Sequence, residues 1–316
     1  MNNSGPARTS ILVIKLGALG DIIQALGPMQ AIRRHHAADH ITVLTTPPYR
    51  DLISAAGVCD QVIIDEKPKF AEIGKWLRLR KILLSGAYAR VYDLQTSDRS
   101  SSYFRLFWPG PKPAWSGIAA GCALRHTNPK RDLMHTVERQ AEQLEIAGIT
   151  DVPLTDLGPI ISDISHLKLP ANYCLIAPGG AEHRPAKRWP KDRYRDLIRK
   201  LDHAEITPVI CGTAAERPLA AMLIEGAITA RNIAGETSLP DLVTAAKRAR
   251  FAVGNDSGTM HIAAYAGIPS IVLYSHASDP ALCAQRGSDV TILRRQSLQE
   301  LGVDEVYSQL PVQGGS

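Results

Sequence analysis

The stretch ILVIKLGALGDIIQAL, residues 11–26, is the part of the sequence that decides the fold. Its apolar start predicts a buried strand, Gly17 and Gly20 predict a tight turn, and Asp21 opens a helix with apolar residues at helical spacing. This order indicates a parallel α/β sheet, in which ligands bind at the carboxyl ends of strands. The glycine spacing is GxxG rather than GxGxxG, and no acidic residue closes a second strand as expected, so an NAD-dependent oxidoreductase is disfavoured.

Short apolar runs alternate with helical patterns along the chain, which predicts the α/β class throughout. The proline-containing segment Asp151–Pro170 breaks this alternation and predicts a connection between two domains, residues 1–155 and 171–298. A last helix, at about residues 300–312, is expected to pack back on the first domain. The predicted strands are Ile11–Leu16, Ile41–Thr45, Val62–Ile64, Val91–Leu94, Tyr173–Ala177, Pro208–Cys211, Phe251–Val253, Ser270–Leu273 and Val290–Leu293.

Composition limits the classes of function. The chain has 316 residues, of which 45% are hydrophobic, so it is long enough for two domains with their own cores. Aromatic residues make up only 5%, which argues against binding of single-stranded nucleic acid by stacking, and we expect no nucleic-acid partner. The net charge of +5 lies mainly in residues 1–160 and suits an anionic partner as well as an ordinary solvated surface. The five cysteines are widely spaced, so neither a disulfide framework nor a metal site is expected.

Asp21 has two interpretations. A carboxylate in the first turn of a helix is stabilised by the helix dipole, and the sequence alone favours this structural role. A carboxylate at the same place, on a rigid element beside a ligand site, also suits a general base.

A second candidate site is FAVGNDSGTMHIAAYAGIP, residues 251–269, where a polar turn leads from a strand into a helix. Free backbone N–H groups and the helix dipole make such a helix start an anion site, suited to a pyrophosphate. Ser257 adds a hydroxyl donor there, and Asp256 is placed to hold sugar hydroxyls. The alternative is a helix capped by either side chain, while a histidine one turn into the helix, His261, is more often structural.

A third loop, APGGAEHRPAKRWP, residues 177–190, follows another predicted strand. Lys187 is positioned to neutralise phosphate charge on a leaving group. Arg184 and Arg188 are better read as a solvated basic surface.

Together, in this order and spacing, the GALGD start, the PGG…AKRWP loop and the GNDSGTMHIAAYAGIP stretch followed by Ser278-Asp-Pro resemble glycosyltransferase family 9, the ADP-heptose:lipopolysaccharide heptosyltransferases. The resemblance covers most of the chain. It implies the GT-B architecture, in which two Rossmann-like domains face a central cleft, with the acceptor on the N-terminal domain and the nucleotide-sugar on the C-terminal one. It also implies an inverting reaction without a metal or cofactor.

The resemblance further implies the roles of individual residues. Asp21 is expected to deprotonate the acceptor hydroxyl, Lys187 to hold the donor phosphate, and Asp256 to contact the donor sugar. The remaining donor-binding residues are expected to be Gly179 and Gly180 through their backbone, Glu216 at the ribose, Thr237 near adenine, Ser257 and Gly258 at the pyrophosphate, and His261 nearby.

The chain departs from the family pattern at three places. Ser257 stands where threonine is usual, which keeps the hydroxyl. Gly179 and Gly180 replace hydroxyl residues of some members, so backbone N–H groups must serve there. Ser275-His276-Ala277 replaces a loop that usually contains glycine or proline, which affects the expected shape of the donor pocket.

On the acceptor side, we expect Gly20, Arg125, Lys130 and Arg131 to meet the anionic glycolipid. The basic stretch Lys67–Lys81, with Trp76, Leu77, Ile82 and Leu83 among or beside its charges, suits an anionic glycolipid or membrane surface, or simply a solvated helix face.

No signal peptide is recognisable, and no stretch approaches the roughly 18 apolar residues of a membrane span. We therefore expect a cytoplasmic location with at most peripheral contact at the inner face of the membrane.

The leading interpretation is transfer of a heptose from ADP-heptose to an inner-core lipopolysaccharide acceptor. A family member acting on another polysaccharide or on a protein remains open, as does a non-catalytic nucleotide-binding module. The presence of Asp21, Lys187 and Asp256 together disfavours the non-catalytic alternative.

Overall fold

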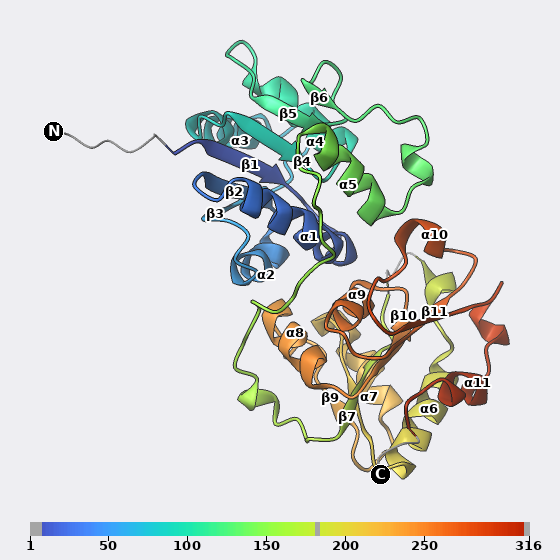
Figure 1. Ribbon diagram of the computed structural model, residues 1–316. Helices are drawn as coiled ribbons and strands as arrows, with labels where there is room; N and C mark the ends of the chain where they lie inside the picture. Colours follow the sequence, from blue (N-terminus) through green and yellow to red (C-terminus); the bar gives the residue numbers. More distant parts are fainter. Residues whose placement is uncertain (1–7, 181–183, 313–316) are drawn as a thin grey trace. The chain divides into compact units, whose positions relative to one another are not determined.

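The structure is a computed structural model that describes residues 8–180 and 184–312. The chain forms two compact units, which meet in sequence at Asp156 and Leu157, inside the segment expected to connect two domains. Each unit contains one six-stranded sheet with helices packed against it (Figure 1). No helix within the described ranges is both long and apolar enough to cross a membrane.

The sheet of the first unit is entirely parallel and has the strand order β3-β2-β1-β4-β5-β6. The chain therefore leaves β1 in one direction along the sheet and returns to its other side with β4, so the switch point lies between these two strands. The strands are β1 (Ser10–Ile14), β2 (His40–Thr45), β3 (Gln61–Ile64), β4 (Arg90–Asp93), β5 (Ala114–Gly117) and β6 (Leu124–Arg125), and the helices are α1 (Leu19–His35), α2 (Arg50–Ala55), α3 (Ile73–Ser85), α4 (Asp98–Tyr103) and α5 (Thr136–Ile146).

Side chains of the first sheet are buried on both of its faces. Leu12 and Ile14 of β1 belong to a core with Leu83 of α3, Tyr103 of α4 and Trp115 of β5. The intervening side chains of β1 point to the opposite face of the sheet, because neighbouring residues in a strand alternate. They are also buried, as expected for a parallel sheet covered by helices on both sides.

The sheet of the second unit repeats this topology, with the order β12-β11-β10-β7-β8-β9 and all strands parallel. Its switch point lies between β7 and β10. The strands are β7 (Tyr173–Ala177), β8 (Thr207–Ile210), β9 (Arg231–Asn232), β10 (Ala252–Asn255), β11 (Ser270–Tyr274) and β12 (Val290–Arg294), and the helices are α6 (Lys191–His203), α7 (Arg217–Leu223), α8 (Leu239–Arg248), α9 (Gly258–Tyr265), α10 (Pro280–Cys283) and α11 (Val303–Ser308). Short 3-10 helices are η1 (Pro47–Tyr49), η2 (Phe104–Phe107), η3 (Arg131–Leu133), η4 (Ser165–Leu167), η5 (Pro185–Lys187), η6 (Ala214–Glu216) and η7 (Leu298–Glu300).

The expectation that the last helix packs on the first domain is wrong. Val303, Val306 and Leu310 belong to the core of the second unit, and α11 lies beside α6 (Figure 1). A salt bridge of 2.8 Å from Lys200 to Asp304 joins the two helices. The apolar side of α11 is therefore buried in the core of the second unit.

The connecting segment belongs partly to each unit. The hydroxyl of Thr155 accepts from the amide of Gly27 at 3.1 Å and donates to the carbonyl of Ile23 at 2.6 Å, which fixes this part of the segment on α1. Farther along, the Lys247 ammonium on α8 donates to three carbonyls of the segment, at Leu157, Gly158 and Ile160.

Candidate functional site

Asp256, directly after β10, lies at the switch point of the second unit and has several hydrogen-bond partners. Its Oδ2 accepts from the Lys187 ammonium at 2.6 Å and from the Ser278 hydroxyl at 2.7 Å, and its Oδ1 accepts from the Gln285 amide at 3.1 Å. The Tyr274 hydroxyl, which has one proton, lies 3.0 Å from Oδ1 and 2.8 Å from the Gln285 carbonyl oxygen. Side chains from three loops therefore fix this carboxylate.

The electrostatics of Asp256 favour its ionised form. Burial alone would raise the pKa of this carboxyl, but hydrogen bonds from Lys187, Ser278 and Gln285, together with the lysine charge, lower its pKa below the ordinary value. Burial and the charge of Asp256 raise the pKa of Tyr274 and keep that phenol protonated. The site therefore holds a fixed negative charge paired with one ammonium.

Asn255 is the residue that organises this region, and the sequence interpretation missed it. Its buried carboxamide oxygen accepts from the amide of Trp189 and the hydroxyl of Tyr194, both at 3.0 Å. Its NH₂ group donates to the carbonyls of Pro178 at 2.7 Å and Gly179 at 3.1 Å. One side chain thus ties β10 to the loop after β7 and to the start of α6, which positions Lys187 nearby.

The start of α9 is the expected anion site. Ser257 is the residue before the helix, and Gly258 is its first residue. The Ser257 hydroxyl is buried and has no hydrogen-bond partner among the residues that the structure describes. His261 is buried one turn later, and its amide donates to the Ser257 carbonyl at 3.4 Å. The free amides of the first turn and an unused hydroxyl therefore lie next to Asp256 in the chain.

Glu216 and the glycine pair meet at the ends of β7 and β8. The Gly180 amide donates to Glu216 Oε1 at 3.2 Å, while Oε2 accepts from the Thr213 amide at 2.7 Å. A Cβ on Gly179 would lie 1.9 Å from Oε1, so a larger residue there would displace the Glu216 carboxylate from this position. Thr237 lies farther along the same edge, after β9 and before α8, where it is partly buried.

The remaining departures from the family pattern have plain structural roles. The Ser275 hydroxyl accepts from the Ala277 amide at 3.2 Å, and the exposed His276 ring contacts the Gln296 carbonyl at 2.6 Å.

In the first unit, Gly20 and Asp21 lie in the first turn of α1, at the carboxyl end of β1. The Asp21 carboxylate accepts from the Ala18 amide at 3.1 Å, so the structural role considered for this residue is present. The side chain is also partly exposed, which leaves it accessible to a reactant. Gly17 adopts a φ of +123° beside the Tyr49 ring, a conformation that favours glycine.

Behind Asp21 lie two buried ionisable groups that the sequence interpretation did not use. Lys15 donates to the Leu94 carbonyl at 3.1 Å, and burial lowers its pKa while the charge of Asp21 raises it. Asp93 ends β4, and burial raises its pKa to about 6, partly offset by the Thr96 amide. The switch point of the first unit therefore combines an accessible carboxylate with a buried lysine and a buried carboxyl.

The predicted acceptor residues are spread over the segment before α5. Arg125 is exposed on β6, and Lys130 is exposed with its amide bonded to Asn128 at 2.8 Å. Arg131 is half-buried and donates to the Thr96 hydroxyl, which follows β4. Of the three, Arg131 is therefore the one tied to the edge of the sheet where Asp21 lies.

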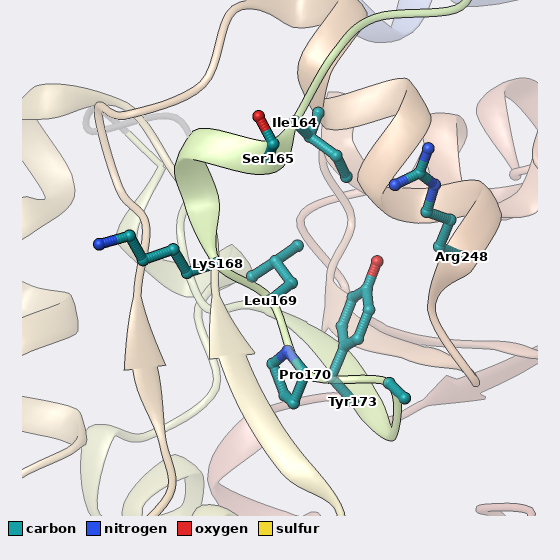
Figure 2. Close-up of a pocket in the computed structure, with 8 residues that line it drawn as sticks. Ile164, Ser165, Lys168, Leu169, Pro170, Tyr173 and Arg248 are labelled. Atoms are coloured by element: carbon teal, nitrogen blue, oxygen red, sulfur yellow. The ribbon is translucent and has the colours of Figure 1, made fainter.

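Two pockets differ in their place on the sheets. A pocket of about 770 Å³ in the first unit is lined by Gly17, Tyr49, Lys67 and Lys75 among others, at the carboxyl ends of β1 to β3. A smaller one, of about 290 Å³, lies at the amino end of β7 in the second unit, where Lys168 and Arg248 stand on opposite sides of apolar residues (Figure 2). Only the first has the position typical of ligand sites in open α/β sheets.

Comparisons with known proteins identify the family and the fold. The model of glycosyltransferase family 9 (heptosyltransferase) matches residues 76–302. Lipooligosaccharide heptosyltransferase 2 of Haemophilus ducreyi is 32% identical over 315 residues, which cover 90% of this chain and 88% of that protein. Lipopolysaccharide heptosyltransferase 2 of Salmonella typhimurium is 38% identical over 104 residues, and this match spans 31% of this chain and only 30% of that relative.

The solved structure of E. coli ADP-heptose lps heptosyltransferase II has a TM-score of 0.81 and 23% identity, covering 95% of this chain and 97% of that chain. At this identity the likeness concerns the fold, and it identifies the two Rossmann-like units as GT-B type. The family model covers well over half of the chain. The chain therefore belongs to glycosyltransferase family 9.

Proposed function

We propose that the protein transfers a heptose from ADP-heptose to an inner-core lipopolysaccharide acceptor, with inversion at the anomeric carbon and without a metal. The observation that carries this proposal is the cluster at the switch point of the second unit. There Lys187, Asp256 and the start of α9 bring an ammonium, a fixed carboxylate and free amides together. The names of the relatives supply the donor and acceptor classes, which come to this chain as part of the proposal.

In the donor half of the proposed mechanism, the diphosphate binds at the Ser257–Gly258 helix start, where the unused hydroxyl donates to a phosphate oxygen. Lys187 neutralises the negative charge that develops on the leaving phosphate. Asp256 accepts hydrogen bonds from the sugar hydroxyls, and its low pKa keeps it in the accepting form. His261 supports the same helix turn.

The nucleoside half of the donor lies along the same edge of the sheet in this proposal. Glu216 accepts hydrogen bonds from the ribose hydroxyls, and the backbone near Thr237 meets adenine. Gly179 and Gly180 let the phosphates approach the backbone closely, because neither has a side chain.

In the acceptor half, the attacking hydroxyl oxygen forms a bond to the anomeric carbon while the bond from that carbon to the phosphate oxygen breaks. Asp21 takes the proton of the acceptor hydroxyl, and ADP leaves with the bonding electron pair. Gly20 allows close approach beside this carboxylate. Arg125, Lys130 and Arg131 pair with the anionic groups of the acceptor. Such a glycolipid is held in a membrane, so the proposed reaction takes place at a membrane surface, on its cytoplasmic side.

Calorimetric titration of the purified protein with ADP-heptose, a UDP-sugar and NAD tests the donor assignment. We expect saturable binding of ADP-heptose and at least about tenfold weaker binding of the other two, a difference of about 1.4 kcal/mol or more. The UDP-sugar has a different base, whereas NAD has the same adenine but carries nicotinamide riboside in place of the heptose. Preference for the uridine donor would overturn the donor assignment. Transfer is then measured with heptose-free core lipopolysaccharide and with polysaccharide and peptide acceptors, and transfer only to the latter would overturn the acceptor assignment.

A further inference from the structure

Large apolar side chains are exposed along one side of α3 and beside it. Phe70 is 98% exposed, Ile73 68%, Leu77 62% and Trp108 70%. Ile73 and Leu77 are four residues apart on α3 and therefore lie on one face of the helix, and Leu84, also exposed, continues this face. We call these five residues the α3 patch.

Hydrogen bonds hold the parts of the patch together. The Trp76 indole donates to the Lys69 carbonyl at 3.0 Å, which fixes the turn that carries Phe70 against α3. The Arg80 guanidinium donates to the Trp108 carbonyl at 3.1 Å, which fixes the end of η2 against the same helix. The patch is thus formed by three chain segments and has a defined shape.

The structure also corrects which apolar residues of this stretch are available to a partner. In the sequence, Trp76, Leu77, Ile82 and Leu83 lie among or beside the basic residues, and this stretch suited either a glycolipid or membrane surface or a solvated helix face. Leu83 is buried in the core of the first unit, and Trp76 packs against it and against the Tyr103 ring. Of the four, Leu77 is the exposed one that belongs to the patch.

The chain segment that carries most of the patch, residues 67–81, is rich in basic residues. Two acidic residues among them are already engaged, since Glu72 binds Lys75 at 2.7 Å and Glu66 lies 3.6 Å from Arg78. The cations outnumber these carboxylates, so the surface around the apolar residues is positive. The basic residues of this region are Lys67, Lys69, Lys75, Arg78, Arg80 and Lys81.

We propose that the α3 patch docks the first unit on an anionic bilayer, with Phe70, Ile73, Leu77 and Trp108 inserted at the headgroup level. A helix that presents apolar residues flanked by lysine and arginine is suited to this environment, and tryptophan favours the membrane interface. Lysine is depleted at protein–protein interfaces, which makes a protein partner the poorer match. The inference goes beyond the proposed transfer reaction, because the patch is distinct from the residues assigned to donor and acceptor.

Co-sedimentation with lipid vesicles tests the proposal. We expect the full-length protein to bind vesicles of phosphatidylglycerol and phosphatidylcholine and to bind pure phosphatidylcholine at least about tenfold more weakly, because each nearby cation adds about 1 kcal/mol on an anionic surface. Raising the ionic strength from about 0.1 to about 1 M shortens the Debye length from about 10 to about 3 Å and should release most of the protein. Equal binding to both vesicle types would overturn the proposal.

A matched pair of double variants tests the apolar residues. Ile73→Ser with Leu77→Ser should weaken vesicle binding by about tenfold or more, since two inserted aliphatic side chains are lost. Ile161→Ser with Ile228→Ser changes two side chains of the second unit that are 79% and 90% exposed, and should leave binding unchanged. Thermal melting of both variants checks that they fold. Equal vesicle binding by the two double variants would contradict the proposal.

Two further measurements distinguish docking on a bilayer from association of the chain with itself. Quenching of tryptophan fluorescence by brominated lipids should fall in Trp108→Phe, because Trp115 and Trp189 are buried and Trp76 packs against the core of the first unit, which leaves Trp108 as the most exposed of the four tryptophans. Sedimentation velocity should show the same association state for the wild type and for Ile73→Ser with Leu77→Ser. If the wild type is a dimer that this variant dissolves, and neither binds vesicles, the patch contacts a second copy and the proposal is wrong.

Discussion

The two units share one topology, yet their switch points are built differently. In the second unit, Asp256 is buried and receives hydrogen bonds from several side chains. In the first unit, Asp21 is partly exposed and its carboxylate caps its own helix through the Ala18 amide. In both sheets the strand order places the expected ligand site at the carboxyl ends of the strands. The surrounding side chains determine how buried each carboxylate is and which groups donate hydrogen bonds to it.

The difference in burial between Asp256 and Asp21 is consistent with the role proposed for each residue. A group that must hold a sugar and a phosphate benefits from fixed geometry and a constant charge, as at Asp256. A group that must take up a proton from a reactant has to be accessible, and Asp21 is partly exposed. Buried Lys15 and Asp93 lie behind Asp21 in the first unit, whereas in the second unit Lys187 bonds directly to Asp256.

The largest expected effect comes from Asp21→Asn. Asparagine still accepts from the Ala18 amide, but it has no basic oxygen, so kcat for transfer should fall by about 10²- to 10⁴-fold. Affinity for ADP should not change, because this binding is assigned to the other unit. The same change at Asp51, in the first turn of α2, serves as control and should leave kcat unchanged. Wild-type transfer by Asp21→Asn would remove the proposed base.

Lys187→Met tests the donor side. Loss of the ammonium should lower kcat by about 10²- to 10³-fold in steady-state transfer assays, because the charge on the leaving phosphate is no longer neutralised. Arg184→Met, an exposed cation in the same loop, should have little effect. A comparable loss in both variants would assign the effect to the general charge of the loop.

Asp256→Asn should lower the free energy of unfolding by about 3 kcal/mol at neutral pH, since it leaves the partly buried Lys187 ammonium without its counter-charge. The pKa of Asp256 is lowered in the folded state, so the stability it contributes is present above the unfolded pKa of 3.8 and is lost as the pH falls below that value. Urea unfolding of both proteins between neutral and acid pH measures this. A difference that persists unchanged in acid would contradict the assignment.

Asp93→Asn should behave in the opposite way. The pKa of Asp93 is raised from 3.8 to about 6 in the folded state, so its contribution to stability is full below 3.8 and is lost as the pH rises to about 6. Asparagine keeps the oxygen that accepts from the Thr96 amide and does not ionise. The variant should gain about 2–3 kcal/mol over the wild type between about pH 4 and pH 7. Parallel pH profiles of the two proteins in urea unfolding would show that Asp93 does not titrate in this range.

The smallest effect is expected for Ser257→Ala. Its hydroxyl has no partner among the described residues, so removing it should leave the melting temperature nearly unchanged. Affinity for ADP should fall by about fivefold, the value of one hydrogen bond of about 1 kcal/mol. Ser257→Thr keeps the hydroxyl and should retain the wild-type affinity in calorimetry. Unchanged affinity in the alanine variant would move the diphosphate away from this hydroxyl.

Each strand predicted from apolar runs is present in the structure, whereas β5, β6 and β9 were missed. The β5 sequence AWSG has little strand signal of its own, and β6 and β9 have two residues each. Such strands form because a neighbouring strand offers unpaired backbone groups. Their formation therefore depends on tertiary context rather than on the propensity of the local sequence. The last helix was assigned to the wrong unit for the same reason, since an apolar face does not specify which surface will cover it.

By itself, the sequence determined the α/β class, a connection between two domains within residues 151–170, and the strand-to-helix turns near Asp21, Lys187 and Asp256, because glycine turns and strand–helix periodicity are local properties. Only the tertiary structure decided which groups meet: Asn255 with the loop after β7, Gln285 and Ser278 with Asp256, and Lys15 with the edge of the sheet near Asp21. It also selected Ile73 and Leu77, rather than Leu83, as the exposed side chains of α3. Contacts between distant residues depend on how strands are ordered and which helix face is covered, and no local pattern encodes that choice.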